Sequence, residues 1–416
     1  MSAAEKNVRP TNSTPMRWLS IVGIGEDGVA GLSLHARSLI ESAELVVGGA
    51  RHLALAAPII TGERLPWPSP IEAALPEILR HHGRPVAIIA TGDPFHYGIG
   101  KQIAAVIPPE EFVCIPQPSA FALAAARLGW ALQDVAPVSL HGRALTGIVR
   151  HLQPGARILA LSWDGETPAK LAMLLTARGM GASRLTVLEA MGGARERVRG
   201  AQAYRFDLTD VSSLNTIAIE VATDTDAKIV PLAAGIDDAL FETDGQLTKR
   251  ELRATVLSSL SPRQGELLWD IGLGAGSIAI EWLLRHPSMR AIGIEADPDR
   301  AARAARNAEA LGAPDLQIVE GHAPDALEGL PQPDAVFIGG GLGDGCIEAA
   351  VRALRPGGRL VANAVTLEGE QQLLQAFTHH GGELTRMAIE RAAPVGTMHA
   401  WRPALPIVHW RITKPC

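Results

Sequence analysis

Apolar runs along the chain alternate with glycine-rich turns and with segments of helical periodicity. In the second half, an apolar run over 267–269 leads into the acid and glycine-rich turn of 270–276, Asp-Ile-Gly-Leu-Gly-Ala-Gly. A helical pattern over 277–285 follows, and a second apolar run over 291–294 ends on Glu295. A strand, a turn, a helix and a second strand in this order predict a parallel α/β sheet.

The first half of the chain shows the same alternation in shorter pieces. A continuous apolar run such as 86–90 is typical of a strand that is buried on both faces of a parallel sheet. The predicted strands are 18–24, 44–47, 86–90, 157–161, 184–188 and 214–221, and the predicted helices are 33–42, 120–128 and 169–176. This order predicts two small α/β lobes with a cleft between them.

The pattern divides the chain into four parts. Residues 1–16 are polar and predict a disordered tail, and the two lobes occupy 17–222. A polar stretch with proline and glycine over 223–240 predicts a linker. Residues 241–416 form a second α/β domain, which contains the glycine-rich turn.

Composition excludes several classes of protein. Hydrophobic residues make up 47% of the 416 and charged residues 20%, as in ordinary globular proteins. A net charge of -6 and an aromatic content of 4% argue against a nucleic-acid footprint. Cys114, Cys346 and Cys416 are too far apart to predict a zinc site or a disulfide framework. Without a signal peptide or a long apolar run, we expect a cytoplasmic protein with no membrane partner.

The turn of 270–276 and Glu295 together predict a nucleoside-binding site. Glycines let a ligand approach the backbone, and an acid about twenty residues further on can accept hydrogen bonds from ribose hydroxyls. NAD and S-adenosylmethionine (SAM) both fit this pattern. The Gly-x-Gly-x-Gly spacing favours SAM, and so does Asp270, which would repel a pyrophosphate but attract an ammonium group. Later turns at 339–341 and 354–360 are also typical of SAM methyltransferases.

Two loops in the first half follow predicted strands. The sequence 23–28, Gly-Ile-Gly-Glu-Asp-Gly, matches a dinucleotide fingerprint, but the next strand ends in Gly48-Gly49 where a ribose acid is expected. The loop 91–100 follows the strand 86–90, at the edge of the sheet where ligands of α/β proteins bind. A plain turn of Gly, Asp and Pro is the alternative for this loop.

The first half resembles the tetrapyrrole methylase family of SAM enzymes. The resemblance rests on Gly-Asp-Pro-Phe-His-Tyr-Gly over 92–98, with the loop at 23–25 and Pro-Ser-Ala-Phe over 118–121 in support. It implies that SAM lies in the cleft between two lobes. The residues that it places against this cofactor are Gly92, Asp93, Pro94, Phe95, Ser119, Ala120, Met191, Leu214 and Asn215.

The second half resembles the decarboxylating C-15 methyltransferases that act on precorrins. The resemblance rests on 244–251, on 269–276 and on 361–369, although Ala275 stands where many relatives have serine. It implies a Rossmann-like SAM-methyltransferase fold. The SAM contacts implied are Asp270, Gly272, Gly274, Gly276, Ser277, Glu295, Ala296, His322 and Ala323, and the catalytic candidates are Thr248, Lys249 and Asn363.

Several of these residues have a simpler interpretation. Thr248 with Glu251 could form a helix-capping box instead of covering the active-site mouth. His322 could be a polar loop residue, and the glycines at 339–341 could form a tight turn instead of making room for a flat substrate. The candidates for binding substrate carboxylates are Lys101, Arg195, Arg197, Lys249 and Arg250. Arg300, Arg303 and Arg306 recur at helical spacing and favour a solvated helix face.

Together the two resemblances imply a bifunctional enzyme of cobalamin biosynthesis. It would methylate a reduced precorrin at C-5 and C-15 and remove carbon dioxide from the ring C acetate at C-12. The resemblance also implies a homo-oligomer, with a tetramer through the C-terminal domain as one arrangement. The alternatives are a two-domain SAM methyltransferase for a different tetrapyrrole, and a SAM-sensing protein with one degenerate half.

Overall fold

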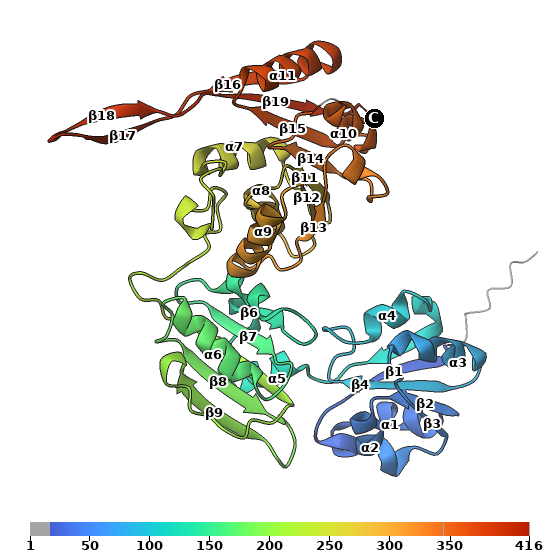
Figure 1. Cartoon of the computed structure of the whole chain (residues 1–416). Helices are drawn as coiled ribbons and strands as arrows, with labels where there is room; N and C mark the ends of the chain where they lie inside the picture. Colours follow the sequence, from blue (N-terminus) through green and yellow to red (C-terminus); the bar gives the residue numbers. More distant parts are fainter. Residues whose placement is uncertain (1–16, 344, 416) are drawn as a thin grey trace, which may run out of the picture. The chain divides into compact units, whose positions relative to one another are not determined.

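The computed structural model describes residues 17–343 and 345–415, so the predicted tail at 1–16 lies outside the described residues. The chain forms two compact units (Figure 1). Unit 1 comprises the residues up to 142 and residues 154–227, and unit 2 comprises 143–153 and the chain from 228 onward. Each unit is α/β, as the sequence predicts.

Unit 1 begins with a parallel sheet in the order β3-β2-β4-β1-β5. Its strands are β1 (Leu19–Ile24), β2 (Leu45–Gly48), β3 (Glu63–Pro66), β4 (Val86–Thr91) and β5 (Phe112–Ile115). The helices that follow them are α1 (Leu34–Glu41), α2 (Ala50–Ala56), α3 (Leu75–Arg80) and α4 (Gly100–Ala104). One apolar cluster lies on each face of this sheet, which explains why β1 and β4 are continuous apolar runs.

A second sheet of unit 1 has the order β6-β7-β10-β8-β9. Its strands are β6 (Val135–Ser139), β7 (Arg157–Leu161), β8 (Arg184–Glu189), β9 (Arg197–Gln202) and β10 (Asn215–Glu220). The helices of this part are α5 (Ala120–Leu128) and α6 (Thr167–Ala177). Only the β6–β7 pair is parallel, and β10 joins β7 and β8 as an antiparallel neighbour.

Unit 2 is built on a seven-stranded sheet in the order β13-β12-β11-β14-β15-β19-β16. The strands are β11 (Leu267–Ile271), β12 (Arg290–Glu295), β13 (Gln317–Glu320), β14 (Ala335–Ile338), β15 (Arg359–Ala364), β16 (Glu383–Met387) and β19 (Ile407–Thr413). The helices are α7 (Arg250–Leu260), α8 (Ser277–Leu283), α9 (Pro298–Leu311), α10 (Cys346–Ala353) and α11 (Leu367–His380). The strand order reverses between β11 and β14, and ligands of such sheets bind beyond the carboxyl ends at this reversal.

The two faces of β15 have different partners. Leu360, Ala362 and Ala364 join the apolar cluster that also contains residues of α10 and α11. The alternate residues Arg359 and Asn363 point to the other face, because successive side chains of a strand alternate. There Arg359 donates to the main-chain oxygens at the end of α7.

A two-stranded ribbon of β17 (Glu390–Val395) and β18 (Met398–Pro403) extends from the sheet between β16 and β19 (Figure 1). The apolar pattern did not predict this ribbon. Nearly all of its residues are exposed.

The capping-box interpretation of Thr248 is wrong. Helix α7 begins at Arg250, and Lys249 is its N-cap residue without a side-chain hydrogen bond. The main-chain oxygen of Thr248 accepts a hydrogen bond from Arg253 Nη1, whereas Glu251 pairs with Arg391. The buried side chain of Arg253 therefore holds the segment before α7, and no side-chain cap is formed.

Residues 143–153 leave unit 1 and pack in unit 2 as the 3-10 helix η6 (Leu145–His151). Ile148 and Val149 are buried there, and Arg150 Nη2 donates to Leu283 O at 3.0 Å. Sequence reasoning placed the whole segment in the first domain, because an insertion held by distant contacts leaves no local pattern.

Arg253 and Glu281 form a buried ion pair between α7 and α8. Both side chains are 0% exposed, and Arg253 Nε lies 2.9 Å from Glu281 Oε1. The same carboxylate accepts the backbone N–H groups of Gly235 and Ile236 at 2.7 and 2.9 Å. One acid therefore anchors both α7 and the segment that precedes it.

Glu281→Ala should destabilise unit 2 by about 3–5 kcal/mol, because it leaves a buried guanidinium and two backbone donors without their acceptor. Hydrogen exchange of the α7 and α8 amides reports the stability of this unit alone. Glu383→Ala is the control, since the pair with Arg411 is exposed and should be worth at most about 1 kcal/mol. Equal losses in the two variants would contradict the anchoring role.

Candidate active sites

The glycine-rich turn of unit 2 lies between the ends of three neighbouring strands. Gly272 has a φ of +73°, and a Cβ atom there would lie 2.7 Å from the backbone of Gly340, in the turn after β14. Gly272 and Leu273 both donate hydrogen bonds to Ile294 O of β12. A Cβ atom on Gly274, at a φ of +56°, would have Gly272 O as its nearest neighbour, at 4.0 Å. The turn is thus fixed on two sides and accessible on a third.

Glu295, at the end of β12, faces this turn. Its Oε2 accepts from Gly274 N at 2.7 Å and its Oε1 from Asp297 N at 3.1 Å. A carboxylate offers about four acceptor positions, so two remain for ribose hydroxyls. The arrangement fits the predicted role of Glu295 and fixes the orientation of the carboxylate.

Asp270 has a different environment from the one predicted. The side chain is only 1% exposed, and its Oδ2 accepts from Ala279 N in the first turn of α8 at 3.0 Å. The pKa of Asp270 is raised to about 8, mainly by burial and to a lesser extent by Glu295, while the hydrogen bond from Ala279 lowers it. In this structure the carboxyl group therefore supports the turn and helix directly.

Asn307 of α9 connects the glycine-rich turn to the segment before α7. This side chain is 2% exposed, and its Nδ2 donates to Ala275 O and to Glu242 O, both at 2.9 Å. Its Oδ1 accepts from Glu242 N at 2.8 Å. One carboxamide thus holds the glycine-rich turn beside the segment that precedes the 244–251 motif.

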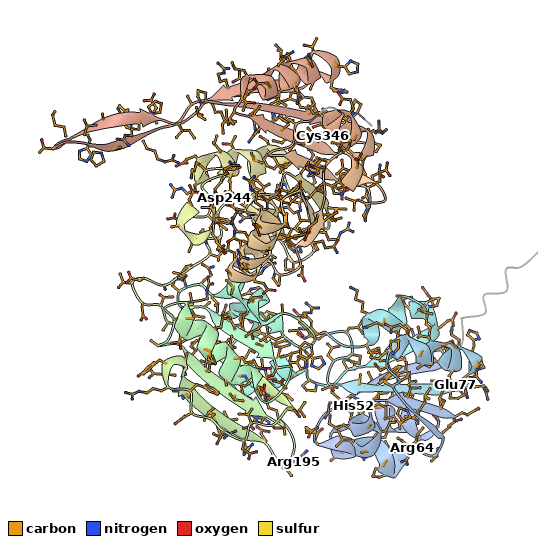
Figure 2. All side chains as sticks on the ribbon, in the orientation of Figure 1. His52, Arg64, Glu77, Arg195, Asp244 and Cys346 are labelled. Atoms are coloured by element: carbon orange, nitrogen blue, oxygen red, sulfur yellow. The ribbon has the colours of Figure 1, made fainter. Side chains whose placement is uncertain are left out.

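The arginines of α9 hold the same segment. Arg300 and Arg303 bind Asp244 at 3.0 and 3.1 Å, and Arg306 binds Glu242 at 2.6 Å. Arg306 is 57% exposed, as expected of a solvated face, but all three arginines also pair with acids of this segment. Figure 2 shows Asp244 in this region of unit 2.

The three catalytic candidates lie on two elements of unit 2. Thr248 and Lys249 precede α7, and Lys249 Nζ is 3.9 Å from Asp238. Asn363 lies near the end of β15, where its Oδ1 is 2.8 Å from His409 Nδ1. Arg250 is exposed on the first turn of α7. These positions keep Lys249 and Arg250 available as weakly held cations.

The remaining cofactor candidates of unit 2 follow α8 or the neighbouring strands. Ser277 is the first residue of α8 and is buried, whereas Ala296 is exposed beyond β12. His322 is exposed and Ala323 half-buried, in the loop after β13. Gly321 N at the start of that loop donates to Glu295 O, so the loop borders the same strand end.

In unit 1, three loops meet at the carboxyl edge of the first sheet. Gly92, with a φ of +55°, donates to Ile24 O and accepts from Gln117 N at 3.0 Å. A Cβ atom on Gly23 would collide with Gly92 O, and one on Gly92 would lie 2.9 Å from Pro118 O. The glycines predicted from the sequence therefore allow β1, β4 and the segment before α5 to pack closely.

The other candidates around this edge have local roles. Asp93 Oδ1 accepts from Phe95 N at 2.9 Å, Phe95 is exposed, and Pro94 is buried between them. Ser119 Oγ caps α5 by accepting from Ala122 N. Ala120 is the first residue of that helix. Each of these roles shapes the loop and leaves main-chain groups to face a ligand.

Asn215 supplies an unfilled hydrogen-bonding position in the second sheet. Its side chain is 8% exposed, and its Nδ2 donates to Asp164 O and Ser212 O at 3.1 and 2.8 Å. Its Oδ1 is buried and has no hydrogen-bond partner among the described residues. Met191 lies nearby, because Ala190 N donates to Leu214 O. A buried acceptor of this kind fits a ligand that donates a hydrogen bond.

Sequence reasoning missed a polar cluster at the same edge of unit 1. Arg51 of α2 pairs with Glu26, and its Nη2 donates to His52 Nε2 at 2.9 Å and to Thr91 Oγ1 at 2.8 Å. Because a guanidinium only donates, His52 accepts at Nε2. Burial and then Arg51 lower the pKa of His52 to about 4. Arg195 lies 4.0 Å from Glu26 (Figure 2 labels His52 and Arg195). The signal was Arg51-His52, which follows Gly48-Gly49 after one alanine.

The carboxylate-binding candidates of unit 1 differ in availability. Arg197 binds Glu189, which is 0% exposed, at 2.7 Å and also lies near Asp210. Its guanidinium neutralises a buried acid, so the prediction that it holds substrate is not supported by its position. Arg195 is 85% exposed and Lys101 is exposed on α4.

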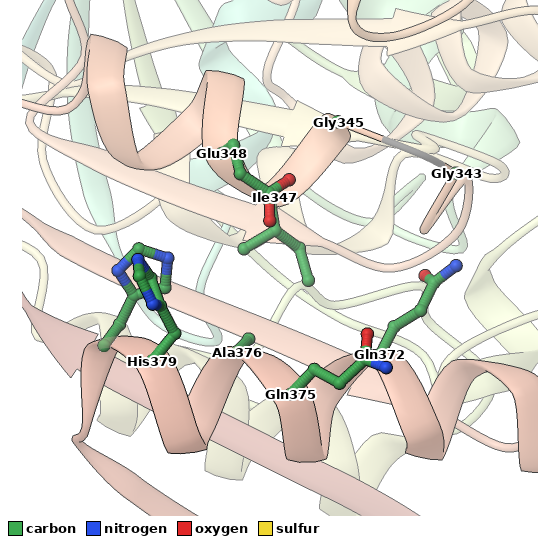
Figure 3. Close-up of a pocket in the computed structure, with 9 residues that line it drawn as sticks. Gly343, Gly345, Ile347, Glu348, Gln372, Gln375, Ala376 and His379 are labelled. Carbon is green, nitrogen blue, oxygen red and sulfur yellow. The ribbon is translucent and has the colours of Figure 1, made fainter.

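A cavity of about 180 Å³ lies between α10 and α11 (Figure 3). It is lined by Gly343, Gly345, Ile347, Glu348, Gln372, Gln375, Ala376, His379 and His380. None of the predicted cofactor-binding or catalytic residues is among these lining residues. The candidate sites are therefore built on the strand ends and not on this cavity.

Two family models match the chain. Residues 19–206 match the Tetrapyrrole (Corrin/Porphyrin) Methylases, and residues 239–414 match the Precorrin methyltransferase domain. A curated protein of Sinorhizobium sp, named Precorrin-6Y C(5,15)-methyltransferase [decarboxylating], is 56% identical over 98% of both chains. This chain belongs to the precorrin-6Y C(5,15)-methyltransferase (decarboxylating) family. Membership confirms both resemblances and the predicted fold class.

Two further proteins of this family show lower identities to this chain. The protein of the same name from Mycobacterium tuberculosis is 39% identical over 95% of this chain and 99% of its own. A crystal structure of the C-terminal domain of precorrin-6Y C5,15-methyltransferase from Rhodobacter capsulatus is 44% identical, covers 44% of this chain and 100% of its own, and has a TM-score of 0.43. No helix in the described part of this chain has the length and apolar character that crossing a membrane requires.

Asp270 should make the stability of ligand-free unit 2 depend on pH. The folded pKa of about 8 lies above the ordinary value of 3.8, so the folded state keeps a proton that the unfolded state releases. The free energy of unfolding should therefore decline between about pH 4 and pH 8, by about 1 kcal/mol per pH unit, and level off above.

Urea unfolding followed by the ¹⁹F signal of 5-fluorotryptophan at Trp282, a buried residue of α8, measures this slope. Asp270→Asn should flatten it, because an amide still accepts from Ala279 but does not titrate. Asp299→Asn, at an exposed position of α9, should keep the wild-type slope. The same slope in wild type and Asp270→Asn would show that burial does not keep this acid protonated.

Proposed function

We propose that this chain methylates a reduced precorrin at C-5 with unit 1 and at C-15 with unit 2, and that unit 2 also removes carbon dioxide from the ring C acetate at C-12. The observation that carries the proposal for unit 2 is the Asn307 carboxamide, which joins the glycine-rich turn to Glu242, just before the 244–251 motif. One side chain thus connects the cofactor turn to the segment that precedes the substrate motif, and this supports methyl transfer from the cofactor to the substrate. A different tetrapyrrole is the alternative substrate.

SAM, when bound, supplies the electrophilic methyl group to each unit. In unit 2, Glu295 would hold the ribose, the turn at 272–276 would accommodate the cofactor backbone, and Ala296, His322 and Ala323 would border the base. In unit 1, the main chain at 92–95, 119–120, 191 and 214–215 would enclose it, and Asn215 Oδ1 would accept a hydrogen bond. The residues of both sites fit a neutral or cationic nucleoside better than a pyrophosphate, because they include acceptor oxygens that would repel phosphate groups.

Methyl transfer requires that these residues align the ring carbon with the methyl group, and it requires little acid–base chemistry. The conjugated ring carbon supplies the electron pair, so no activated serine or cysteine is needed. The protein holds the ring carbon in line with the transferred group, which can lower the barrier by several kcal/mol. Rigid turns such as the one between Gly272 and Gly340 support this role.

Decarboxylation breaks the bond between the acetate methylene and its carboxylate. Carbon dioxide leaves, the electron pair enters the conjugated ring, and the methylene carbon then takes up a proton to become a methyl group. Holding the acetate out of the ring plane in a poorly hydrated site favours this step. Thr248, Lys249 and Asn363 are the residues that we assign to orient the acetate.

The substrate carries many carboxylates, and exposed cations near the sites would bind them. Lys249 and Arg250 in unit 2 and Arg195 and Lys101 in unit 1 are such cations.

Cys114 and Cys346 are free thiols, which supports a reducing compartment, the cytoplasm.

The wild-type chain should bind two molecules of SAM, and calorimetric titration counts them. Gly92→Ala should abolish one site, because a Cβ atom at this φ meets Pro118 O. Glu295→Ala should weaken the other by about 1.5–3 kcal/mol, the cost of a charged hydrogen bond. With precorrin as substrate, mass spectrometry should show that the product of Gly92→Ala lacks the C-5 methyl group. The product of Glu295→Ala should lack the C-15 methyl group and keep the carboxylate of its ring C acetate.

Glu328→Ala removes an exposed carboxylate elsewhere in unit 2 and should leave both sites intact. A wild-type chain that binds one SAM would rule out two active units. A product with the C-15 methyl group that still carries its ring C acetate would rule out the decarboxylation. Full-length variants are preferable to separated halves, because 143–153 belongs to unit 2.

We also propose a homo-oligomer, with a tetramer as one arrangement, built through the β17–β18 ribbon. Met398, Trp401 and Val395 are 72%, 69% and 53% exposed on it. An isolated two-stranded ribbon is marginally stable in water and has two unpaired edges. A second copy offers both the apolar cover and the matching edge.

Met398→Ser with Trp401→Ser should lower the molar mass in solution towards that of one chain, because these changes remove apolar surface from the ribbon. Sedimentation equilibrium measures the mass. Leu374→Ser, an exposed apolar position on α11, is the matched control and should not change it. An unchanged mass in the double variant would place any interface elsewhere.

A further inference from the structure

Asn363 lies at the edge of the sheet where the substrate of unit 2 is expected. The parallel pairing of β14 with β15 ends at Ile338 and Ala362, and Asn363 is the next residue. Beyond Ile338 the chain enters the turn of 339–341, whose Gly340 contacts Gly272. The Asn363 backbone is therefore beside the strand whose following turn packs against the cofactor turn.

His409 of β19 lies directly opposite Asn363 in the antiparallel register. His409 is 4% exposed, its Nδ1 is 2.8 Å from Asn363 Oδ1, and its Nε2 is 3.0 Å from Ser259 Oγ. Burial is the main cause that lowers the pKa of His409, with Arg411 contributing in the same direction and Glu383 opposing. A neutral imidazole has one donor and one acceptor.

The three side chains therefore have one consistent arrangement of protons. An amide oxygen only accepts, so Nδ1 of His409 carries the proton and donates to Asn363. Nε2 is then the acceptor, and the hydroxyl of Ser259, in the last turn of α7, donates to it. The chain of bonds runs from Ser259 through His409 to the oxygen of Asn363.

This arrangement leaves the other end of the amide for a ligand. No hydrogen bond to Asn363 Nδ2 occurs among the described residues, and this nitrogen is not among the buried atoms without a partner. Two N–H donors are thus directed away from His409, at an accessible point of a side chain that is otherwise buried. With the proton on Nδ1, a flipped amide would place its NH₂ group against the Nδ1–H donor, so this tautomer of His409 allows one orientation of the amide.

We propose that His409 and Ser259 are positioning residues, which fix the Asn363 amide so that its NH₂ group donates hydrogen bonds to a carboxylate oxygen of the tetrapyrrole in unit 2. The inference rests on the proposed function and adds the device that orients the catalytic candidate. Lys249 is 42% exposed and has only a 3.9 Å contact to Asp238, whereas the Asn363 amide is held by a buried bond to His409, which Ser259 holds in turn. A fixed neutral donor can select one acetate of a substrate that carries many.

The test compares His409→Leu, His409→Asn, Ser259→Ala and Asn363→Ala in the full-length chain. His409→Leu removes the donor, and kcat/KM for C-15 methylation with carbon dioxide loss should fall roughly tenfold, the value of about one hydrogen bond. His409→Asn should restore most of this loss, because the asparagine Nδ2 takes the place of the imidazole Nδ1. C-5 methylation by unit 1 should be unchanged in every variant and serves as the internal control for intact protein.

A double-variant cycle separates positioning from mere support of the fold. Adding His409→Leu to Asn363→Ala should cause no further loss of activity, because the amide that His409 orients is already absent. In the ligand-free wild type, ¹⁵N NMR of His409 should show a neutral ring with the proton on Nδ1, and Ser259→Ala should perturb the Nε2 signal.

Two results would overturn the inference while leaving the proposed function intact. They are additive losses in the double variant and a proton on Nε2 in the wild type. Full C-15 activity in Asn363→Ala would instead show that Asn363 does not bind the substrate. The hydrogen bonds from Ser259 and His409 would then have no substrate-binding group to orient. A wild-type chain that never methylates precorrin would count against the proposed function itself.

Discussion

In both units, a glycine of one strand end packs against the backbone of the neighbouring strand end. Gly272 after β11 contacts Gly340 after β14, and Gly23 at the end of β1 contacts Gly92 after β4. A side chain at Gly272 or Gly23 would force the two ends apart, because the obstructing atoms are backbone atoms. The glycine-rich turn at 272–276 and the loop at 92–100 start from these strand ends, so both candidate sites depend on this closeness.

The polar groups around these turns act mostly through the backbone. Glu295 accepts two main-chain N–H groups, Asp270 accepts one, and Asn307 binds two segments by their peptide groups. Buried acceptors that are satisfied in this way hold a loop without restricting which side chains it carries. The ligand then meets main-chain groups and a few fixed side chains, and the exposed cations such as Lys249 remain adjustable.

The parts that could be predicted from the sequence are those whose contacts are local. The unit from β11 to β12 was predictable, because its strand, turn, helix and acid follow one another within about thirty residues, the length of one such unit. The positions of Asn307 and His409 were not, because each contacts a segment far away in the chain through a side chain that also suits an ordinary helix or strand. Thr248 shows the converse: a local capping pattern was present, but the buried Arg253 binds its carbonyl group instead.

The insertion of 143–153 shows why a boundary that is clear in the sequence can be incomplete in the structure. Arg150 donates to Leu283 O, the last residue of α8, and to Gly312 O, just past the end of α9. Helix ends leave carbonyl groups without intrahelical partners, and a cation there also opposes the negative end of the helix dipole. Both helices begin at the cofactor turn or directly after Glu295. Arg150 lies in the chain between β6 and β7 of unit 1. Its guanidinium thus binds carbonyl groups at the carboxyl ends of α8 and α9, the two helices that begin at the site of unit 2. A cut in the linker would remove it, so the second unit depends on the first half of the chain for its own helix termini.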